Sequence, residues 1–266
     1  MVIPIDFFAA IYYNYLIEES FGRSYLSSRK QKFAAFTVNC GKDKGLAFGD
    51  FMKTIIFDLD GTLLDTLADL ADSANHTMEQ MGFPTYSLDK YRYFVGNGVP
   101  KLLERCLPEN KRTEKNIQTA RTIFAEYYNV HFADKTKPYD GVAELLESLK
   151  KSSVKMAVAS NKSDEFTQSI VKRFFGNAFD MVQGGRADVP KKPAPDIAYG
   201  IMEKLGAVPE NTYFAGDSNV DMFTAKNAGI TAIGCLWGFR TKEELVDGGA
   251  DFLAESPIDI YKVLER

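Results

Sequence analysis

The stretch Lys53-Thr-Ile-Ile-Phe-Asp-Leu-Asp-Gly-Thr-Leu-Leu-Asp65 joins a short apolar run to two closely spaced aspartates. Residues 54–57 are β-prone, which predicts a strand buried on both faces. Residues two apart in an extended chain point to the same side, so Asp58 and Asp60 are expected to face one pocket. Gly61 permits a sharp turn, and Thr62 adds a hydroxyl and an amide. Taken alone, the pattern is also typical of a turn whose aspartates cap the next helix.

The residues that follow predict a helical segment. Apolar residues recur at helical spacing over about 66–81, 99–107 and 113–132, and no strand is apparent before Pro138. Asp65 or Thr66 is expected to cap the first of these helices. An all-helical insertion after a strand is typical of a lid over a site. We therefore assign residues 67–137 to a helical cap.

From Pro138 onward, short apolar strands alternate with amphipathic helices. Strands are expected at 155–159, 179–182, 213–215, 231–235 and 252–253. This alternation predicts right-handed βαβ units and a doubly wound, mostly parallel sheet. We expect an α/β fold in which residues 52–66 and 138–266 form a Rossmann-like hydrolase core.

Polar residues follow several of these strands. Ser160 and Asn161 follow one strand, Lys192 lies in the loop after the next, and Asp217 and Asp221 follow a third. Each cluster alone has an ordinary explanation, such as a helix cap, a solvated lysine or acids at a helix start. Because ligands in doubly wound folds bind at the carboxyl ends of strands, these residues are expected to meet the aspartates of the first strand in one crevice.

Together the four clusters resemble the four motifs of the haloacid dehalogenase-like hydrolases, a superfamily dominated by phosphatases. They occur in the same order, as Asp58-x-Asp60-Gly-Thr62, Ser160, Lys192 before Pro-x-Pro-Asp, and Gly216-Asp217-Ser-x-x-Asp221. The resemblance runs from Met52 to the end of the chain. Dehalogenases of this superfamily typically lack an acid at the position of Asp60, and P-type ATPases carry a lysine where this chain has Leu59. The resemblance thus implies a phosphatase or a phosphomutase.

The resemblance also implies a role for each position. Asp58 would attack phosphorus and form an aspartyl-phosphate. Asp60 would protonate the leaving group and then deprotonate the hydrolytic water. The phosphoryl oxygens would be bound, and their charge neutralised, by Thr62, Ser160, the Asn161 amide and Lys192.

A Mg²⁺ ion is implied as well. Several carboxylates in one crevice repel one another unless a cation lies between them, and oxygen ligands beside a phosphate suit Mg²⁺. By resemblance its ligands are the Asp58 carboxylate, the Asp60 backbone carbonyl and Asp217. Asp221 would lie behind them and orient Lys192 or a water on the metal.

Within the expected cap, Val95-Gly-Asn-Gly98 followed by Leu102 and Arg105 resembles the cap signature of phosphoglycolate phosphatases. A glycine-flanked helix start with a nearby arginine suits a small anionic group. Gly98 and Arg105 are therefore expected to contact the substrate, and the resemblance implies a small phosphate monoester such as phosphoglycolate. Taken alone, the stretch also fits a glycine-rich helix start beside an exposed arginine.

Three other functions remain open at this point. A β-phosphoglucomutase-like isomerase shares the core motifs, a pyrophosphatase shares the chemistry, and an inactive scaffold would share the fold. Every motif position is intact, which favours an enzyme. The pattern of Gly98 and Arg105 favours the phosphatase over the mutase.

The composition is ordinary for a globular protein, since 45% of the 266 residues are hydrophobic and 26% are charged. A net charge of −4 offers no basic footprint for nucleic acid or an anionic membrane. No apolar run approaches the roughly 20 residues that span a bilayer. The widely spaced Cys40, Cys106 and Cys235 indicate a reducing cytoplasm. We expect a small phosphorylated metabolite as the partner of a monomer or homodimer.

Residues 1–51 differ from the rest, being rich in aromatic residues and ending in a glycine- and lysine-containing stretch. A signal peptide is disfavoured because the segment lacks a basic leader and a clear cleavage site. A membrane-surface helix is disfavoured because its polar face has few lysines or arginines. We expect the functional domain to begin at Met52 and residues 1–51 to be an N-terminal extension of uncertain structure.

Overall fold

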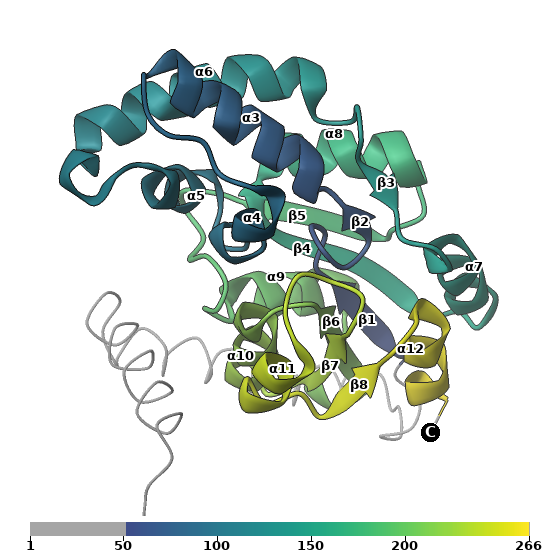
Figure 1. Ribbon diagram of the computed structural model, residues 1–266. Coiled ribbons are helices and arrows are strands. Elements are labelled where there is room, and N and C mark those ends of the chain that lie inside the picture. Colours follow the sequence, from purple (N-terminus) through teal and green to yellow (C-terminus); the bar gives the residue numbers. More distant parts are fainter. Residues whose placement is uncertain (1–51, 266) are drawn as a thin grey trace, which may run out of the picture.

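The computed structural model describes residues 52–265, so the expectations about residues 1–51 lie outside the described part of the chain. A six-stranded parallel sheet forms the centre, in the order β5-β4-β1-β6-β7-β8 (Figure 1). The strands are β1 (Thr54–Phe57), β4 (Lys155–Ser163), β5 (Met181–Gly185), β6 (Thr212–Gly216), β7 (Thr231–Cys235) and β8 (Phe252–Ala254). The predicted α/β fold with a doubly wound parallel sheet is confirmed.

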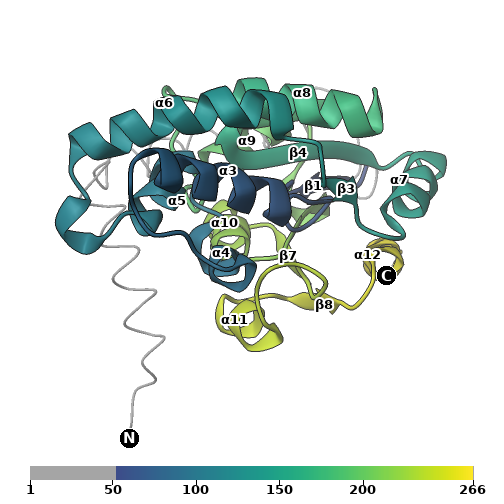
Figure 2. The same cartoon turned by 45° about the horizontal axis from the view of Figure 1, so that its top comes forward.

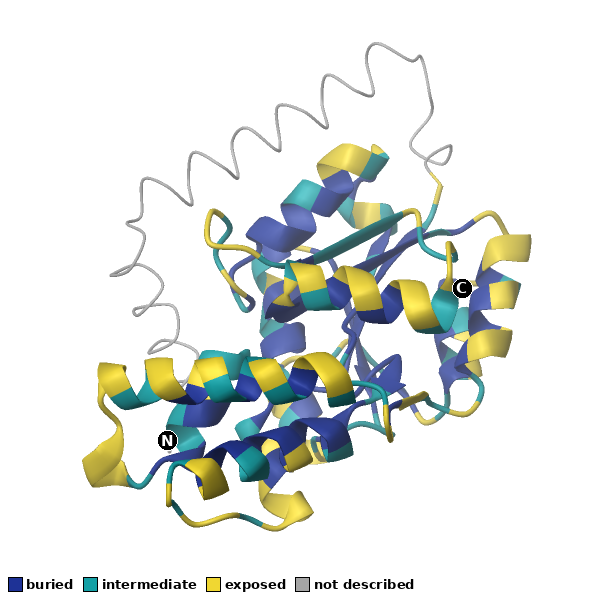
Figure 3. Cartoon of the chain, turned by 90° about the horizontal axis from the view of Figure 1, so that it is seen from above, coloured by how far each residue is buried: buried dark blue, intermediate teal, exposed yellow. Residues whose placement is uncertain are grey.

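Side chains of β1 alternate between two hydrophobic clusters, as the period of a strand requires. Ile55 and Phe57 pack on one face and Ile56 on the other, and all three are fully buried. The first face is covered by α7 (Val142–Lys151), α8 (Asp164–Phe175) and α12 (Pro257–Leu264). The second is covered by α9 (Asp196–Leu205), α10 (Asn219–Ala228) and α11 (Lys242–Asp247). In Figure 3 the central strands are mostly dark blue and lie between helices whose outer faces are exposed, whereas the edge strand β5 is mainly of intermediate burial.

Four further helices lie together beside the sheet (Figure 2). They are α3 (Leu67–Gln80), α4 (Leu88–Phe94), α5 (Val99–Cys106) and α6 (Glu114–His131). Their apolar faces form a hydrophobic cluster of their own, to which Phe239 also contributes. The division of the chain into a core and a cap at residues 67–137 remains a prediction, and this separate cluster supports it.

The chain enters and leaves these helices through a two-stranded antiparallel ribbon. Its strands are β2 (Leu64–Asp65) and β3 (Lys137–Pro138), with Leu64 paired to Pro138. The sequence pattern does not predict this ribbon, because strands of two residues show no periodicity.

Two predicted strands, 155–159 and 179–182, differ from the structure by more than one residue at an end. β4 continues to Ser163 rather than ending at Ala159, because after a break in register it resumes pairing with β5. β5 begins at Met181 rather than at Phe179, whose ring instead packs into the core, with its centroid 6.3 Å from that of Phe57. The longer β4 carries residues 160–162 into the sheet's carboxyl edge.

Among residues 52–265, none of the helices is both long and apolar enough to cross a lipid bilayer.

Candidate active site

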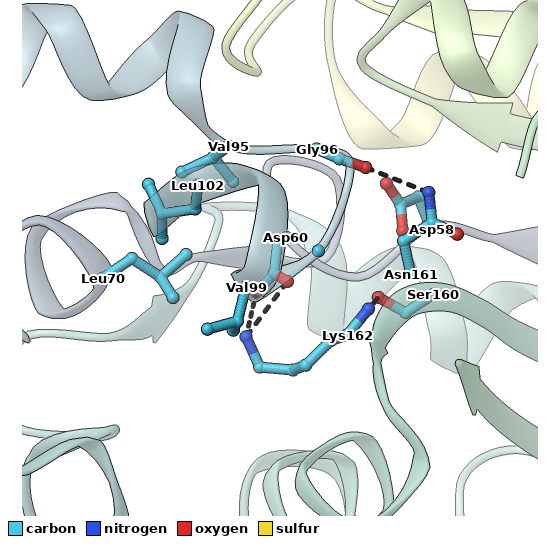
Figure 4. Close-up of a pocket in the computed structure, with 11 residues that line it drawn as sticks. Asp58, Asp60, Leu70, Val95, Gly96, Val99, Leu102, Ser160, Asn161 and Lys162 are labelled. Carbon is cyan, nitrogen blue, oxygen red and sulfur yellow. Dashed lines mark hydrogen bonds and ion pairs between the residues drawn. The ribbon is translucent and has the colours of Figure 1, made fainter. Parts of the chain in front are cut away.

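A cavity opens where the carboxyl ends of β1 and β4 face α3, α5 and the loop between α4 and α5 (Figure 4). One side is polar and comes from the sheet, whereas the other is mainly apolar and comes from the helices. The lining residues are Asp58, Asp60, Leu70, Val95, Gly96, Gly98, Val99, Leu102, Ser160, Asn161 and Lys162.

Asp58 directly follows β1 and is held by a buried lysine. The Lys192 Nζ atom lies 2.8 Å from Asp58 Oδ1 and 2.7 Å from Asp221 Oδ1, and its side chain is 1% exposed. The backbone N–H of Leu59 also donates to Asp58 Oδ1, at 2.7 Å. Asp221 accepts a second bond from the Ser218 hydroxyl at 2.6 Å. Lys192 therefore bridges Asp58 and Asp221, and the predicted orienting contact of Asp221 with Lys192 is present.

Asp217 follows β6 and is enclosed by backbone. Its Oδ2 accepts from the Phe239 N–H at 2.8 Å, and its Oδ1 accepts from the Thr62 hydroxyl at 3.3 Å. Gly61 has a φ of +90°, and a Cβ there would lie 2.3 Å from Asp217 Oδ2. A Cβ at Gly238 would lie 2.2 Å from Asp217 Cβ. Only glycine fits at both positions, so the two turns hold this carboxylate against the end of β1.

The carboxylates of Asp58, Asp217 and Asp221 form one buried acidic cluster, in which one oxygen of each lies within 4.8 Å of the others. Burial and repulsion from Asp221 raise the pKa of Asp58 well above its usual range, against the opposing effect of Lys192. Burial and Asp221 likewise raise the pKa of Asp217 to about 7. A single lysine does not balance three carboxylates, so the donor set fits a divalent cation that prefers oxygen ligands.

Asp60 lies apart from this cluster and pairs with a different lysine. The Lys162 Nζ atom lies 3.0 and 3.1 Å from the two carboxylate oxygens of Asp60. The Thr66 hydroxyl donates to Asp60 Oδ1 at 2.7 Å, so it does not cap α3 as one of the predicted alternatives requires. Burial lowers the pKa of the Lys162 ammonium, but Asp60 and Tyr128 outweigh it and raise that pKa above its usual value.

Sequence reasoning missed Lys162. A signal was available, because Lys162 stands two residues after Ser160, the same spacing as between Asp58 and Asp60. Following the period of a strand beyond the predicted end of β4 would have placed Lys162 on the side of Ser160. Both residues line the cavity (Figure 4).

Ser160 and Asn161 lie at the same edge of the sheet. The Ser160 hydroxyl accepts from the Lys162 N–H at 3.2 Å. The Asn161 side-chain amide donates to the carbonyls of Lys192 and Gly96, both at 3.1 Å, and its oxygen accepts from the Lys192 N–H at 2.9 Å. Asn161 thus joins the Lys192 loop to the loop between α4 and α5.

The substrate contact expected of Arg105 stays a prediction, and the structure shows other contacts of this residue. It is not among the residues that line the cavity. Its guanidinium donates to the carbonyls of Tyr93 and Phe94 at 3.2 and 2.9 Å and to Asn97 Oδ1 at 2.9 Å. Arg105 therefore holds the loop between α4 and α5 from behind.

Gly98 does line the cavity, as expected of a residue that contacts substrate. Its φ is +83°, and a Cβ there would lie 3.0 Å from the Asn161 carbonyl oxygen. A residue with a side chain would strain this turn and push the loop away from the sheet. Gly98 therefore allows the helical side of the cavity to approach the polar side closely.

Comparisons with known proteins agree with this geometry. A profile of the haloacid dehalogenase-like hydrolases matches residues 55–235. The phosphoglycolate phosphatase of Aquifex aeolicus is 33% identical over 216 residues, which cover 81% of this chain and 98% of the relative. The phosphoglycolate phosphatase of Vibrio parahaemolyticus is 32% identical over 219 residues, which cover 80% and 96%.

Solved structures show the same similarity. A predicted phosphoglycolate phosphatase from Haemophilus somnus superposes with a TM-score of 0.75 at 30% identity, covering 80% of this chain and 97% of its own. CbbY from Rhodobacter sphaeroides, solved in complex with phosphate, superposes with a TM-score of 0.67 at 25% identity, covering 79% and 96%.

Proposed function

The chain belongs to the haloacid dehalogenase-like hydrolase family and is a phosphatase, and we propose that it hydrolyses phosphoglycolate or a similarly small phosphate monoester with Mg²⁺ as cofactor. The observation that carries this proposal is the position of Asp58 at the edge of the cavity, in contact with Lys192 and beside Asp217 and Asp221. A nucleophile, a buried cation and a metal-binding carboxylate cluster thus converge on one point.

Asp58 is the proposed nucleophile. The Leu59 N–H and Lys192 Nζ both contact Oδ1 of this carboxylate, and Oδ2 is the proposed attacking atom. Attack on phosphorus forms the bond from Oδ2 to phosphorus and breaks the bond to the ester oxygen, giving an aspartyl-phosphate and an alkoxide. Water then attacks the same phosphorus, which releases inorganic phosphate and restores the Asp58 carboxylate.

Asp60 is the proposed general acid and base. In the first step it gives a proton to the leaving alkoxide, and in the second it takes a proton from the attacking water. Asp60 stands two residues after Asp58 and lines the same cavity. Its contacts with Thr66 and Lys162 hold the carboxylate in a defined orientation.

Ser160, the Asn161 amide, Thr62 and Lys192 are the proposed contacts of the phosphoryl oxygens. Ser160 and Asn161 line the cavity beside Asp58, and Lys192 contacts Asp58 directly. The positive charge of Lys192 would stabilise the charge that develops on the phosphoryl group. The Thr62 hydroxyl donates to Asp217 and would have to turn toward the substrate.

The proposed ligands of Mg²⁺ are the Asp58 carboxylate, the Asp60 backbone carbonyl and Asp217, with Asp221 behind them. When bound, Mg²⁺ supplies positive charge that offsets the repulsion among these carboxylates and the phosphate. The raised pKa values of Asp58 and Asp217 support this, since burial and, after it, repulsion from Asp221 disfavour their charged forms, which a bound cation would stabilise.

We also propose that the protein acts in the cytoplasm on a small phosphorylated metabolite. The buried, unpaired thiols of Cys106 and Cys235 support a reducing compartment. The small cavity supports a small substrate, because its apolar side approaches the polar side through Gly98.

A panel of substrates with and without Mg²⁺ tests the function. We expect Mg²⁺-dependent release of phosphate, with the highest kcat/KM for phosphoglycolate among phosphoglycolate, sugar phosphates, nucleotides and pyrophosphate. Rapid quenching with ³²P-labelled substrate should trap label on the protein at Asp58. If chelating divalent metals does not affect turnover of any substrate in the panel, the proposal that Mg²⁺ is the cofactor is contradicted. If no substrate is turned over, the proposed hydrolysis of small phosphate monoesters is contradicted.

A further inference from the structure

The cavity holds a positive charge to which the proposed mechanism gives no contact with substrate. Among the residues that line it in the described part of the chain, Lys162 is the only lysine or arginine. Its side chain is 4% exposed and its Nζ atom contacts the Asp60 carboxylate. Lys192, which supplies the cation beside the nucleophile, is occupied by Asp58 and Asp221 and does not line the cavity.

The Lys162 ammonium is held in place by the two parts of the structure that meet there. Asp60 from the sheet side accepts from it at 3.0 and 3.1 Å. The ring of Tyr128, on α6, lies with its centroid 5.1 Å from Nζ, a distance suited to a cation–π contact. An ammonium has three N–H donors, and Asp60 shares its Oδ1 with the Thr66 hydroxyl. Asp60 accepts two of them, so the third is the one that an acceptor from the cavity would take, in competition with Tyr128.

The remaining walls make such a cation necessary for a substrate with a second negative charge. Leu70, Val95, Val99 and Leu102 line the helical side. An anion buried against these residues without a partner loses its hydration and gains nothing in exchange. With the phosphoryl group at Asp58, a second anionic group a few bonds away has Lys162 as its available counter-charge within the cavity wall.

We propose that Lys162 binds the second anionic group of the substrate, a carboxylate on a short phosphoryloxy acid, and thereby selects carboxylated phosphate esters over uncharged ones. This inference rests on the proposed function. It assigns to Lys162 the contact that the sequence pattern assigns to Arg105, whose guanidinium is engaged with Tyr93, Phe94 and Asn97 instead.

The test compares two substrates that differ only in the second group. Phosphoglycolate carries a carboxylate, whereas 2-hydroxyethyl phosphate carries a hydroxymethyl group in its place. The readout is kcat/KM for phosphoglycolate divided by kcat/KM for 2-hydroxyethyl phosphate. Loss of Lys162 also removes a partner of Asp60 and so lowers both values, but this effect cancels in the ratio. We expect the wild-type protein to prefer phosphoglycolate, and Lys162→Met to lower the ratio by about 10- to 100-fold, the range for a hydrogen bond to a charged group.

Two variants complete the test. Lys162→Arg retains the charge and should retain most of the ratio. Lys155→Met removes a lysine from the other end of β4, where its Nζ pairs with Asp180 at 2.8 Å, and should leave the ratio unchanged. If Lys162→Met fails to fold, Lys162→Gln is to be measured instead, and the same loss of ratio is expected.

The outcomes separate this inference from the proposed function. A wild-type protein that hydrolyses neither ester would overturn the proposed function. A wild-type protein that hydrolyses both equally well would overturn the carboxylate site and leave the phosphatase standing. Equal losses on both esters in Lys162→Met would also overturn the site and make Lys162 a positioning residue for Asp60.

Discussion

Lys192 and Asp58 form an ion pair at the end of β1, with Lys192 Nζ 2.8 Å from Asp58 Oδ1. The same ammonium lies 2.7 Å from Asp221 Oδ1, and the side chains of Lys192 and Asp221 are 1% and 0% exposed. One lysine thus compensates a fully buried carboxylate, that of Asp221, and the Asp58 carboxylate at the edge of the cavity. This arrangement places a positive charge beside the proposed nucleophile before any substrate arrives.

Replacing Lys192 should be costly for stability. In Lys192→Met, Asp58 and Asp221 lose their shared partner, and we expect the Mg²⁺-free protein to lose about 3–5 kcal/mol of unfolding free energy. Urea denaturation measures the loss, and adding Asp221→Asn should recover part of it. The matched control is Lys155→Met, which breaks a half-exposed pair with Asp180 and should cost about 0–1 kcal/mol. Equal costs in the two variants would contradict the compensating role of Lys192.

Replacing Asp58 should separate activity from stability. Asp58→Asn removes the attacking oxygen while keeping the size of the side chain, so we expect kcat to fall by about 10³-fold or more. The thermal midpoint without metal should stay equal or rise, because burial and Asp221 raise the pKa of Asp58 and so make its charge unfavourable. Near-normal turnover by a homogeneous, sequence-verified sample would remove Asp58 from the role of nucleophile.

The acidic cluster predicts a pH dependence of stability without metal. The pKa of Asp217 is raised to about 7 in the folded protein, from 3.8 as the reference value. At pH below both values the carboxyl is neutral in both states. As pH rises toward 7, the unfolded state releases the proton first and is favoured, so the folded protein loses stability. Above about pH 7 the full penalty is present.

Melting curves of Asp217→Asn and the wild-type protein measure this effect. We expect the variant to gain in thermal midpoint over the wild type between pH 5 and pH 8 when divalent metals are chelated. Saturating Mg²⁺ should reverse the order at pH 8, because the cation offsets the carboxylate charges of the wild type. A difference that does not vary with pH would contradict the raised pKa of Asp217.

The turn at Gly61 predicts a sharp difference between two glycines. In Gly61→Ala the new Cβ would meet Asp217 Oδ2 at 2.3 Å, so both the turn and this proposed metal ligand must move. Gly82 also has a positive φ, of +71°, but has no atom within 4 Å of the built Cβ. We expect Gly82→Ala to cost about 1 kcal/mol, and Gly61→Ala to cost more and to weaken Mg²⁺ binding in calorimetry. Similar effects in both variants would contradict the close approach of Gly61 to Asp217.

Arg105 should affect all substrates alike. Because its guanidinium supports the carbonyls of Tyr93 and Phe94 rather than the cavity, we expect Arg105→Ala to lower kcat/KM by the same factor for phosphoglycolate and for p-nitrophenyl phosphate. Proteolysis should cut the loop between α4 and α5 faster in this variant. A selective loss for phosphoglycolate would restore Arg105 as a substrate contact.

Much of the fold was predictable from local pattern. Residues 54–57 form β1 as expected, and the alternation of strands and helices after Pro138 gives the parallel sheet. The prediction worked because burial on both faces requires an uninterrupted apolar run, which is visible in a few residues. The strand ends were less predictable, since β4 runs on to Ser163 through pairing with β5 that only the folded sheet supplies.

By itself, the sequence determined which chemical groups stand at the carboxyl ends of the strands, including Asp58, Ser160 and Asp217, because these positions follow from short-range periodicity. Only the tertiary structure decided how the charges are paired. It pairs Lys162 with Asp60 and joins the Arg105 guanidinium to the carbonyls of Tyr93 and Phe94. The physical reason is that an ion pair depends on distances between residues far apart in the chain, and those distances are set by the packing of the helices on the sheet rather than by any local pattern.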